Sequence, residues 1–501
     1  MKNGQGKKIA VNAISASVQV VVVGLAYFFL YKYLINKLGV EQLGVWSLIL
    51  STSSIATLAN FGITSGLVKF VADFNAKKKH AEIPELIFTA FVSVAGFYAI
   101  LIAIIYLLAS FIIDRIVDKE HIDIALKLLP FSLLSLFINE IGGVFTSVLE
   151  GYQKNYLRNI IYVVSTIIFL MVVFYLVPDH GLMGVAYAQV FQAALVMTGA
   201  FIFGSKVCGG INLFKLGWNK AIFKQLISYG SKFQLVSIFQ IMYEPVTKAL
   251  LSKMGGLAIV GFYEMASRLI NQARAFIVNA NQVMIPVVAH AANEGKDEVK
   301  SIYAKSLSIT LLVASILVSG VIALGSVISL AWIGHYEPMF IFSLNVLGIA
   351  IYINILCGPA YFGALGEGKL NLLMISSCIM ACLIVVLGYM LGLWLGGTGV
   401  IIAWGITLST GTVVLIYYYQ RSLNAGLRDV LNRSDMVLLC CTLVYISINL
   451  ILGLKTSVAD NITEQFIKNS LLYIIIILPA VAYSKSLRQL ISQVRVREKN
   501  I

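Results

Sequence analysis

The stretch Gly39-Val-Glu-Gln-Leu-Gly44-Val-Trp46 returns in similar form as Gly256-Leu-Ala-Ile-Val-Gly261-Phe-Tyr263, 217 residues further along the chain. In both copies an aromatic residue lies two positions after the second glycine. Two more pairs follow in the same order at an offset of 215 residues: Gly151-Tyr-Gln-Lys154 with Gly366-Glu-Gly-Lys369, and Gly181-Leu-Met-Gly184 with Gly396-Gly-Thr-Gly399. Three matches at nearly one offset predict an internal duplication.

The composition indicates a chain whose main solvent is lipid. Of the 501 residues, 59% are hydrophobic and only 12% are charged, and the mean hydropathy is +0.89. Soluble domains carry about 25% charged residues. These values exclude a soluble enzyme, a disordered chain and a disulfide scaffold. Because no polar stretch is long enough for a separate catalytic domain, we expect no enzymatic activity and no cofactor.

Apolar runs bounded by glycine, proline or charge clusters predict fourteen transmembrane helices, since one span takes about 20 residues. The first run is too long for a cleaved signal peptide and is interpreted as an uncleaved span. The predicted spans are 9–34, 41–68, 85–113, 128–149, 159–177, 182–205, 226–252, 257–290, 301–333, 338–363, 370–395, 398–420, 436–454 and 467–484. An even count places both termini on one side of the membrane.

The distribution of basic residues predicts that this side is the cytoplasm. With the N-terminus inside, 25 of the 37 Lys and Arg residues fall in cytoplasmic segments and 8 in outward segments. This asymmetry follows the positive-inside rule. It also explains most of the net charge of +14 as topology and contact with anionic lipid. No basic patch with interleaved aromatics predicts a nucleic-acid partner, and the scattered Cys and His residues predict no metal site.

The repeat offset covers six helices, so the two copies have the same orientation in the membrane. This is the parallel-repeat plan of some secondary transporters, in which substrate is handled between two lobes. We predict an N-terminal lobe over 1–205, a second lobe over 226–420, and two extra spans with a basic cytoplasmic tail over 421–501. The connector 206–225 carries Trp218 and Phe223 among lysines, which favours an interfacial amphipathic helix, with a plain polar loop as the alternative.

Ionisable residues inside predicted spans are expensive in lipid and are therefore candidate functional residues. Six of the seven lie on the two adjacent spans 226–252 and 257–290, and the set has a net charge of +1. The seven are Glu140, Lys232, Glu244, Lys248, Glu264, Arg268 and Arg274. Pro245 and Pro286 lie in the same two spans, where a proline kinks a helix.

The spacing of these charges predicts two ion pairs. Glu244 and Lys248 share a helix face because they are four residues apart, and so do Glu264 and Arg268. Arg274 has no such partner and needs water, Glu140 or Glu244 across a cavity, or an anionic ligand.

Two functional interpretations of these charges stay open. The first is a wet cationic cavity for a phosphate, which suits the planar fork of arginine. In the second, the pairs only hold the two spans together, and Lys232 snorkels to the interface. A further polar face, Ser51-Thr-Ser-Ser54 with Asn60 and Thr64, either lines a cavity or allows close helix packing.

The chain resembles the oligosaccharide and polysaccharide flippases of the multidrug/oligosaccharidyl-lipid/polysaccharide exporter superfamily over nearly its whole length. The most specific stretches are Leu38-Gly39 through Gly44-Val45-Trp46-Ser47, Asn60-Phe61-Gly62-Ile63, Tyr243-Glu244-Pro245 through Lys248, and Gly261-Phe262-Tyr263-Glu264-Met265-Ala266-Ser267-Arg268. The turns at 366–369 and at Gly396 and Gly399 also fit.

The resemblance implies an all-α integral membrane protein with two parallel six-helix lobes around a central cavity, two extra C-terminal helices and alternating access. It implies a polyprenyl-pyrophosphate-linked oligosaccharide as substrate, moved outward across the bacterial plasma membrane for surface polysaccharide biosynthesis. Partners would be the polysaccharide polymerase and glycosyltransferases of that pathway. Lys248, Arg268 and Arg274 match the cationic residues that such flippases use for substrate, whereas the first lobe has no intramembrane Lys or Arg.

Two rival functions make different demands on the same residues. A multidrug cation antiporter of the same superfamily would need acidic groups in its cavity, and Glu140 is the one such group in the first lobe. A membrane scaffold without transport would have no reason to keep internal basic residues. Glu140, Glu244 and Glu264 are candidate carriers of a coupling ion, H⁺ or Na⁺, because they are carboxylates in predicted spans.

Overall fold

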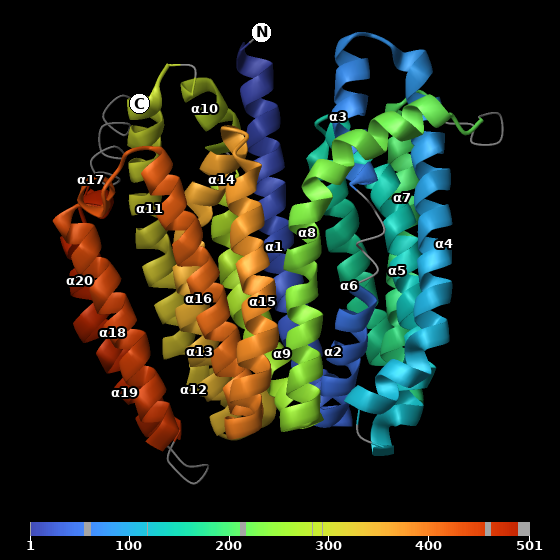
Figure 1. Cartoon of the computed structure of the whole chain (residues 1–501). Coiled ribbons are helices and arrows are strands. Elements are labelled where there is room, and N and C mark those ends of the chain that lie inside the picture. The colour runs from blue at the N-terminus through green and yellow to red at the C-terminus, as the bar shows by residue number, and fades with distance from the viewer. Residues whose placement is uncertain are drawn as a thin grey trace. The chain divides into compact units, whose positions relative to one another are not determined.

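A computed structural model describes residues 2–54, 62–117, 119–210, 217–282, 284–292, 294–455 and 462–488 (Figure 1). These residues form helices joined by short turns, and no strand occurs in the part of the chain so described. The predicted all-α membrane class is confirmed. The chain divides into two compact units, residues 1–260 and 261–501.

The first unit contains eight α-helices and two short 3₁₀ turns. The helices are α1 (Lys2–Leu38), α2 (Val40–Ser54), α3 (Ile63–Ala76), α4 (Ile83–Ile116), α5 (Ile122–Gly151), α6 (Asn155–His180), α7 (Leu182–Val207) and α8 (Lys220–Gly255). Helix α5 packs along α3, α4 and α7, while α1 packs on α6.

The second unit takes up the chain within α9, which begins four residues before the division. Its helices are α9 (Leu257–Asn281), α10 (Met284–Ala291), α11 (Lys296–Ala323), α12 (Gly325–Ile333), α13 (Pro338–Leu356), α14 (Gly358–Gly366), α15 (Leu370–Leu395), α16 (Gly397–Ser422), α17 (Leu427–Val430), α18 (Arg433–Lys455), α19 (Ile462–Leu472) and α20 (Leu478–Tyr483), with a π-helical turn at Tyr473–Ile477. Helices α13 and α16 pack together, and α18 covers α11 and α13.

Eleven helical segments among the described residues are long and apolar enough to cross a membrane, so the predicted count of fourteen is not confirmed. The three further predicted spans are 41–68, 226–252 and 257–290. The first runs through α2, residues 55–61 outside the described part, and α3. The other two correspond to α8 and to α9 with α10. Helices α8 and α9 are long enough, but their charged and amide side chains lower the mean hydropathy.

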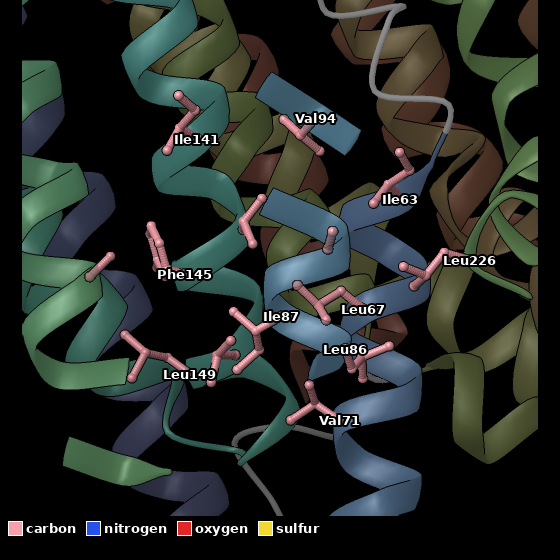
Figure 2. Packing of buried hydrophobic residues seen from close by; sticks show 14 of the residues in the cluster. Ile63, Leu67, Val71, Leu86, Ile87, Val94, Ile141, Phe145, Leu149 and Leu226 are labelled. Carbon is pink, nitrogen blue, oxygen red and sulfur yellow. The ribbon is translucent and has the colours of Figure 1, made fainter. Parts of the chain in front are cut away.

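Close packing of apolar side chains holds the first unit together (Figure 2). Ile63 and Leu67 of α3, Ile87 of α4, and Phe145 and Leu149 of α5 are nearly inaccessible in this cluster. Positions three or four apart on each helix face inward because these spacings share one face. Lipid tails are as apolar as this core, so van der Waals fit, and not exclusion from water, gives the cluster its stability.

The internal repeat has a structural counterpart in matching backbone turns. Gly39 and Gly256 have φ of 85° and 81°, in the left-handed region that favours glycine. Gly184 and Gly399 each follow the turn into a helix at a point of close backbone contact. A Cβ on Gly184 would lie 2.8 Å from Leu176 O, and one on Gly399 only 2.0 Å from Leu391 O. Corresponding glycines therefore meet the same local requirement in both units.

The start of α8 is clipped to α4 within the first unit. The Asn219 side chain accepts from Ala221 N at 2.8 Å, capping α8, and donates to Glu85 Oε1 at 2.9 Å. Trp218 Nε1 donates to Ser93 Oγ at 3.0 Å. Residues 211–216 of the predicted connector lie outside the described residues, so its amphipathic character stays a prediction. The predicted lobe boundaries also stay predictions.

Candidate substrate and coupling sites

The two ion pairs expected from the sequence spacing are formed. In α8, Lys248 Nζ lies 3.4 Å from Glu244 Oε1, and the lysine side chain is buried. In α9, Arg268 Nε donates to Glu264 Oε1 at 2.7 Å. The Glu264 side chain is 3% exposed and that of Arg268 is 44% exposed. One helix face therefore buries the acid while leaving much of its basic partner accessible.

Arg274 has a partner that the sequence did not predict. Its Nε donates to Asn354 Oδ1 of α13 at 2.9 Å, and Asn354 Nδ2 donates in turn to Thr412 Oγ1 of α16 at 3.0 Å. Among the residues that the structure describes, no carboxylate forms an ion pair with Arg274. A neutral amide orients the guanidinium but does not offset its charge. Arg274 therefore keeps an uncompensated positive charge in the second unit.

Two further predicted residues have different outcomes. The Lys232 side chain lies outside the described part of α8, as does the Pro286 side chain in α10, so their roles stay predictions. Glu140 is half-buried on α5, and the phenol of the fully buried Tyr98 donates to its carboxylate from α4. Glu140 thus has a neutral partner, in contrast to Glu244 and Glu264.

Glu140 lines a cavity of about 630 Å³ inside the first unit. Its walls come from α1, α3, α5, α6 and α7, and amide, hydroxyl and phenol groups dominate them. The lining residues are Gln19, Val23, Tyr27, Thr64, Ser65, Val68, Asn139, Glu140, Gly143, Thr146, Ser147, Glu150, Tyr162, Thr166, Gln192 and Val196. This volume is within the range of small-ligand pockets, about 300–1,000 Å³. The described lining holds two glutamates and no lysine or arginine.

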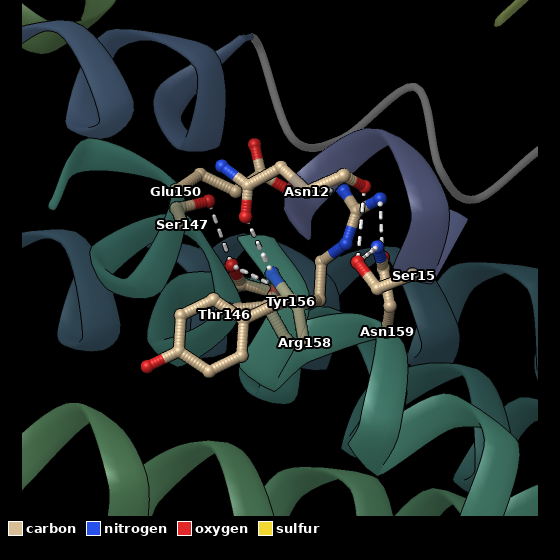
Figure 3. A network of polar contacts seen from close by, with 9 residues as sticks. Asn12, Ser15, Thr146, Ser147, Glu150, Tyr156, Arg158 and Asn159 are labelled. Atoms are coloured by element: carbon tan, nitrogen blue, oxygen red, sulfur yellow. Dashed lines mark hydrogen bonds and ion pairs between the residues drawn. The ribbon is translucent and has the colours of Figure 1, made fainter. Parts of the chain in front are cut away.

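One end of this cavity is closed by a polar network that joins α1 to α5 and α6 (Figure 3). Arg158 forms an ion pair with the cavity residue Glu150. Asn12 Oδ1 accepts from the backbone N–H of Tyr156 at 3.0 Å, and Asn159 Nδ2 donates to Ser15 Oγ at 2.9 Å. The network compensates the Glu150 charge and leaves Glu140 as the carboxylate in the cavity that no basic group pairs among the described residues.

Counting only ionisable residues missed most of this cavity. On α5, Asn139, Gly143, Ser147 and Glu150 are spaced by four, four and three residues, which places them on one helix face. A stripe of small and polar residues along an otherwise apolar span is the signal that could have predicted it. Thr64 does line the cavity, as one interpretation expected, whereas Asn60 lies outside the described residues and the Thr52–Ser54 side chains are not described.

Comparison with known proteins agrees with this helical architecture. Residues 17–176 match the family model MatE. The computed structure superimposes on an inward-facing MATE multidrug resistance transporter with a TM-score of 0.71 at 14% identity, covering 82% of this chain and 98% of that one. The lipid II flippase MurJ gives 0.71 at 14% identity, covering 95% and 100%. A MOP superfamily transporter from Pyrococcus furiosus gives 0.61 at 14% identity, covering 82% and 95%.

The chain has the fold of the MOP superfamily transporters. No curated protein matches it in a sequence comparison. At about 14% identity the MOP fold is shown, and it establishes a multi-pass membrane transporter architecture. The same fold serves more than one function, so the substrate has to be argued from the residues of this chain.

Proposed function

We propose that this MOP-fold protein is a flippase for a polyprenyl-pyrophosphate-linked oligosaccharide. It would move this substrate by alternating access across the bacterial plasma membrane, with both termini in the cytoplasm. The observation that carries the proposal is Arg274, a guanidinium in α9 whose described hydrogen-bond partner is the neutral Asn354. An uncompensated charge in a membrane span is costly, and an anionic headgroup would offset that cost.

Two neighbouring features support an anionic ligand. Arg268 is ion-paired, yet 44% of its side chain is accessible, so it can donate further hydrogen bonds. A pyrophosphate accepts several charge-assisted bonds from such planar forks. Lys248 and Lys232 would add positive charge from α8, and the seven ionisable residues in the predicted spans carry a net charge of +1.

The C-terminal helices also support the flippase over the drug exporters. The multidrug transporter structure covers 82% of this chain, whereas the lipid II flippase covers 95%. The unmatched 5% is about 25 residues, fewer than the 81 residues of 421–501, so the flippase match includes much of the segment with α17 to α20. Partners would be the membrane lipid and the glycosyltransferases and polymerase that make and use the glycan.

Replacing Arg274 with alanine is expected to reduce glycan export at least tenfold at matched protein level, measured as surface glycan against retained lipid-linked glycan. The fold should survive, because the change removes an uncompensated charge. Arg274→Lys should keep part of the activity, since it keeps the charge but loses the fork. The matched control is Arg421→Ala, which removes an exposed arginine at the end of α16. Undiminished export in Arg274→Ala would remove the proposed phosphate site.

We assign ion coupling first to Glu140 among the three candidate carboxylates. Glu244 and Glu264 face Lys248 and Arg268 and are held ionised by them, whereas Glu140 bonds the neutral Tyr98. A carboxylate without a basic partner is the one that can take up H⁺ or exchange Na⁺ during transport.

The acidic cavity supports a second candidate, a multidrug cation antiporter. Its described lining includes Glu140 and Glu150 and no basic residue. Efflux of a cationic dye coupled to H⁺ or Na⁺, with no effect of Arg274→Ala, would favour the antiporter over the flippase.

A further inference from the structure

The cavity of the first unit contains more hydrogen-bonding groups than a coupling ion needs. Its described lining has three amides, five Ser or Thr hydroxyls and two phenols besides the two carboxylates. A site for one cation needs a few oxygens at short range, and no group of three or more His, Cys, Asp or Glu is found among the described residues. The volume of about 630 Å³ fits an organic ligand.

Two of the amides are available to such a ligand. Gln19 of α1 and Asn139 of α5 make no side-chain hydrogen bond within the described residues, and both border the cavity. Gln192, in contrast, already donates to Thr166 Oγ1 at 3.3 Å. An amide donates and accepts at once, which matches the two roles of a sugar hydroxyl.

Aromatic rings and charge narrow the ligand class. Tyr27 and Tyr162 border the cavity, and a phenol ring offers an apolar face for the C–H side of a sugar ring together with a polar tip. With Glu150 paired to Arg158, Glu140 gives the cavity a negative charge. A like charge on the ligand, such as that of a uronic acid or a phosphate, would be repelled.

We propose that this cavity is a subsite for uncharged sugars of the lipid-linked substrate, recognised through Gln19, Asn139 and the neighbouring hydroxyls. The inference rests on the proposed flippase function and deepens it. The first unit binds the neutral sugar, while the basic residues of α8 and α9 bind the pyrophosphate. Specificity for the glycan then resides in α1 and α5, away from the residues that bind the common carrier.

The test is a competition experiment on the purified full-length protein by native mass spectrometry. The probes are a bare polyprenyl pyrophosphate, the same lipid bearing N,N′-diacetylchitobiose, and the same lipid bearing a disaccharide that contains glucuronic acid. We expect the wild-type protein to prefer the neutral glycolipid over the bare carrier at least tenfold, and to show no such preference for the acidic glycolipid.

The variants Gln19→Leu and Asn139→Leu should remove this preference while leaving binding of the bare carrier unchanged. Asn75→Leu, at an amide near the end of α3 outside the cavity lining, should behave as wild type. Because binding of the bare carrier is measured in the same sample, a folding defect would appear as its loss. Thr146→Val, which removes one hydroxyl of the lining with little change in volume, provides a milder second variant.

The outcomes separate the two proposals. Preference retained in both leucine variants, or absent from a wild type that binds the bare carrier, overturns the sugar subsite and leaves the flippase proposal standing. Equal or tighter binding of the acidic glycolipid overturns the selection against charge. If the wild type binds none of the three lipids, the flippase proposal fails, and the sugar subsite with it.

Discussion

Alanine at Gly399 is expected to abolish most of the folded protein. The added Cβ would lie 2.0 Å from Leu391 O and 2.5 Å from Leu391 C, in the backbone of α15 where α16 begins. Backbone cannot move aside as a flexible side chain can, so the turn between the two helices would have to open. Overpacking in a core costs about 1–3 kcal/mol, and a backbone clash belongs at or above the upper end.

The measurement is the apparent melting temperature and monodisperse yield in detergent. At ~2–4 °C per kcal/mol for a unit of this size, we expect a fall of about 10 °C. Gly184→Ala should behave similarly, because its Cβ would meet Leu176 O at 2.8 Å. Gly320→Ala is the matched control, since nothing lies within 4 Å of its Cβ position in α11. A Gly399→Ala protein as stable as Gly320→Ala would show that the α15–α16 turn tolerates a side chain.

Removing Arg268 alone is expected to destabilise the protein more than removing its acidic partner. Glu264 is 3% exposed, so Arg268→Ala leaves a buried carboxylate without its guanidinium. Breaking a buried pair in this way costs about 3–5 kcal/mol. Glu264→Gln instead leaves Arg268, whose side chain is 44% exposed and keeps contact with solvent, so its cost should be about 1 kcal/mol.

The double variant Glu264→Gln, Arg268→Ala separates structural from ligand-binding roles. Its melting temperature should return most of the way to that of the wild type, since no buried charge is left without its partner. Its glycan export should stay low, because the guanidinium that donates to the headgroup is gone. Recovery of both stability and export would show that the pair only holds the helix in place, the alternative that the sequence left open.

Composition and short-range spacing were sufficient for much of this architecture. An apolar share of 59% predicts helices in lipid, because only helices or closed barrels satisfy the backbone there. The Glu244–Lys248 and Glu264–Arg268 pairs follow from a four-residue spacing, since both partners lie on the same helix. Matching glycines at a constant offset predicted the duplication, because such turns depend on local backbone conformation.

Other features could be located only in three dimensions. The partner of Arg274 is 80 residues away in α13, and no sequence pattern links it to Asn354. The cavity of the first unit combines residues from five helices, and its amides and hydroxyls are individually ordinary in a membrane span. The physical reason is range. Hydropathy, turns and same-helix pairs depend on neighbours within a few residues, whereas a buried charge or a cavity depends on which helices tertiary packing places side by side.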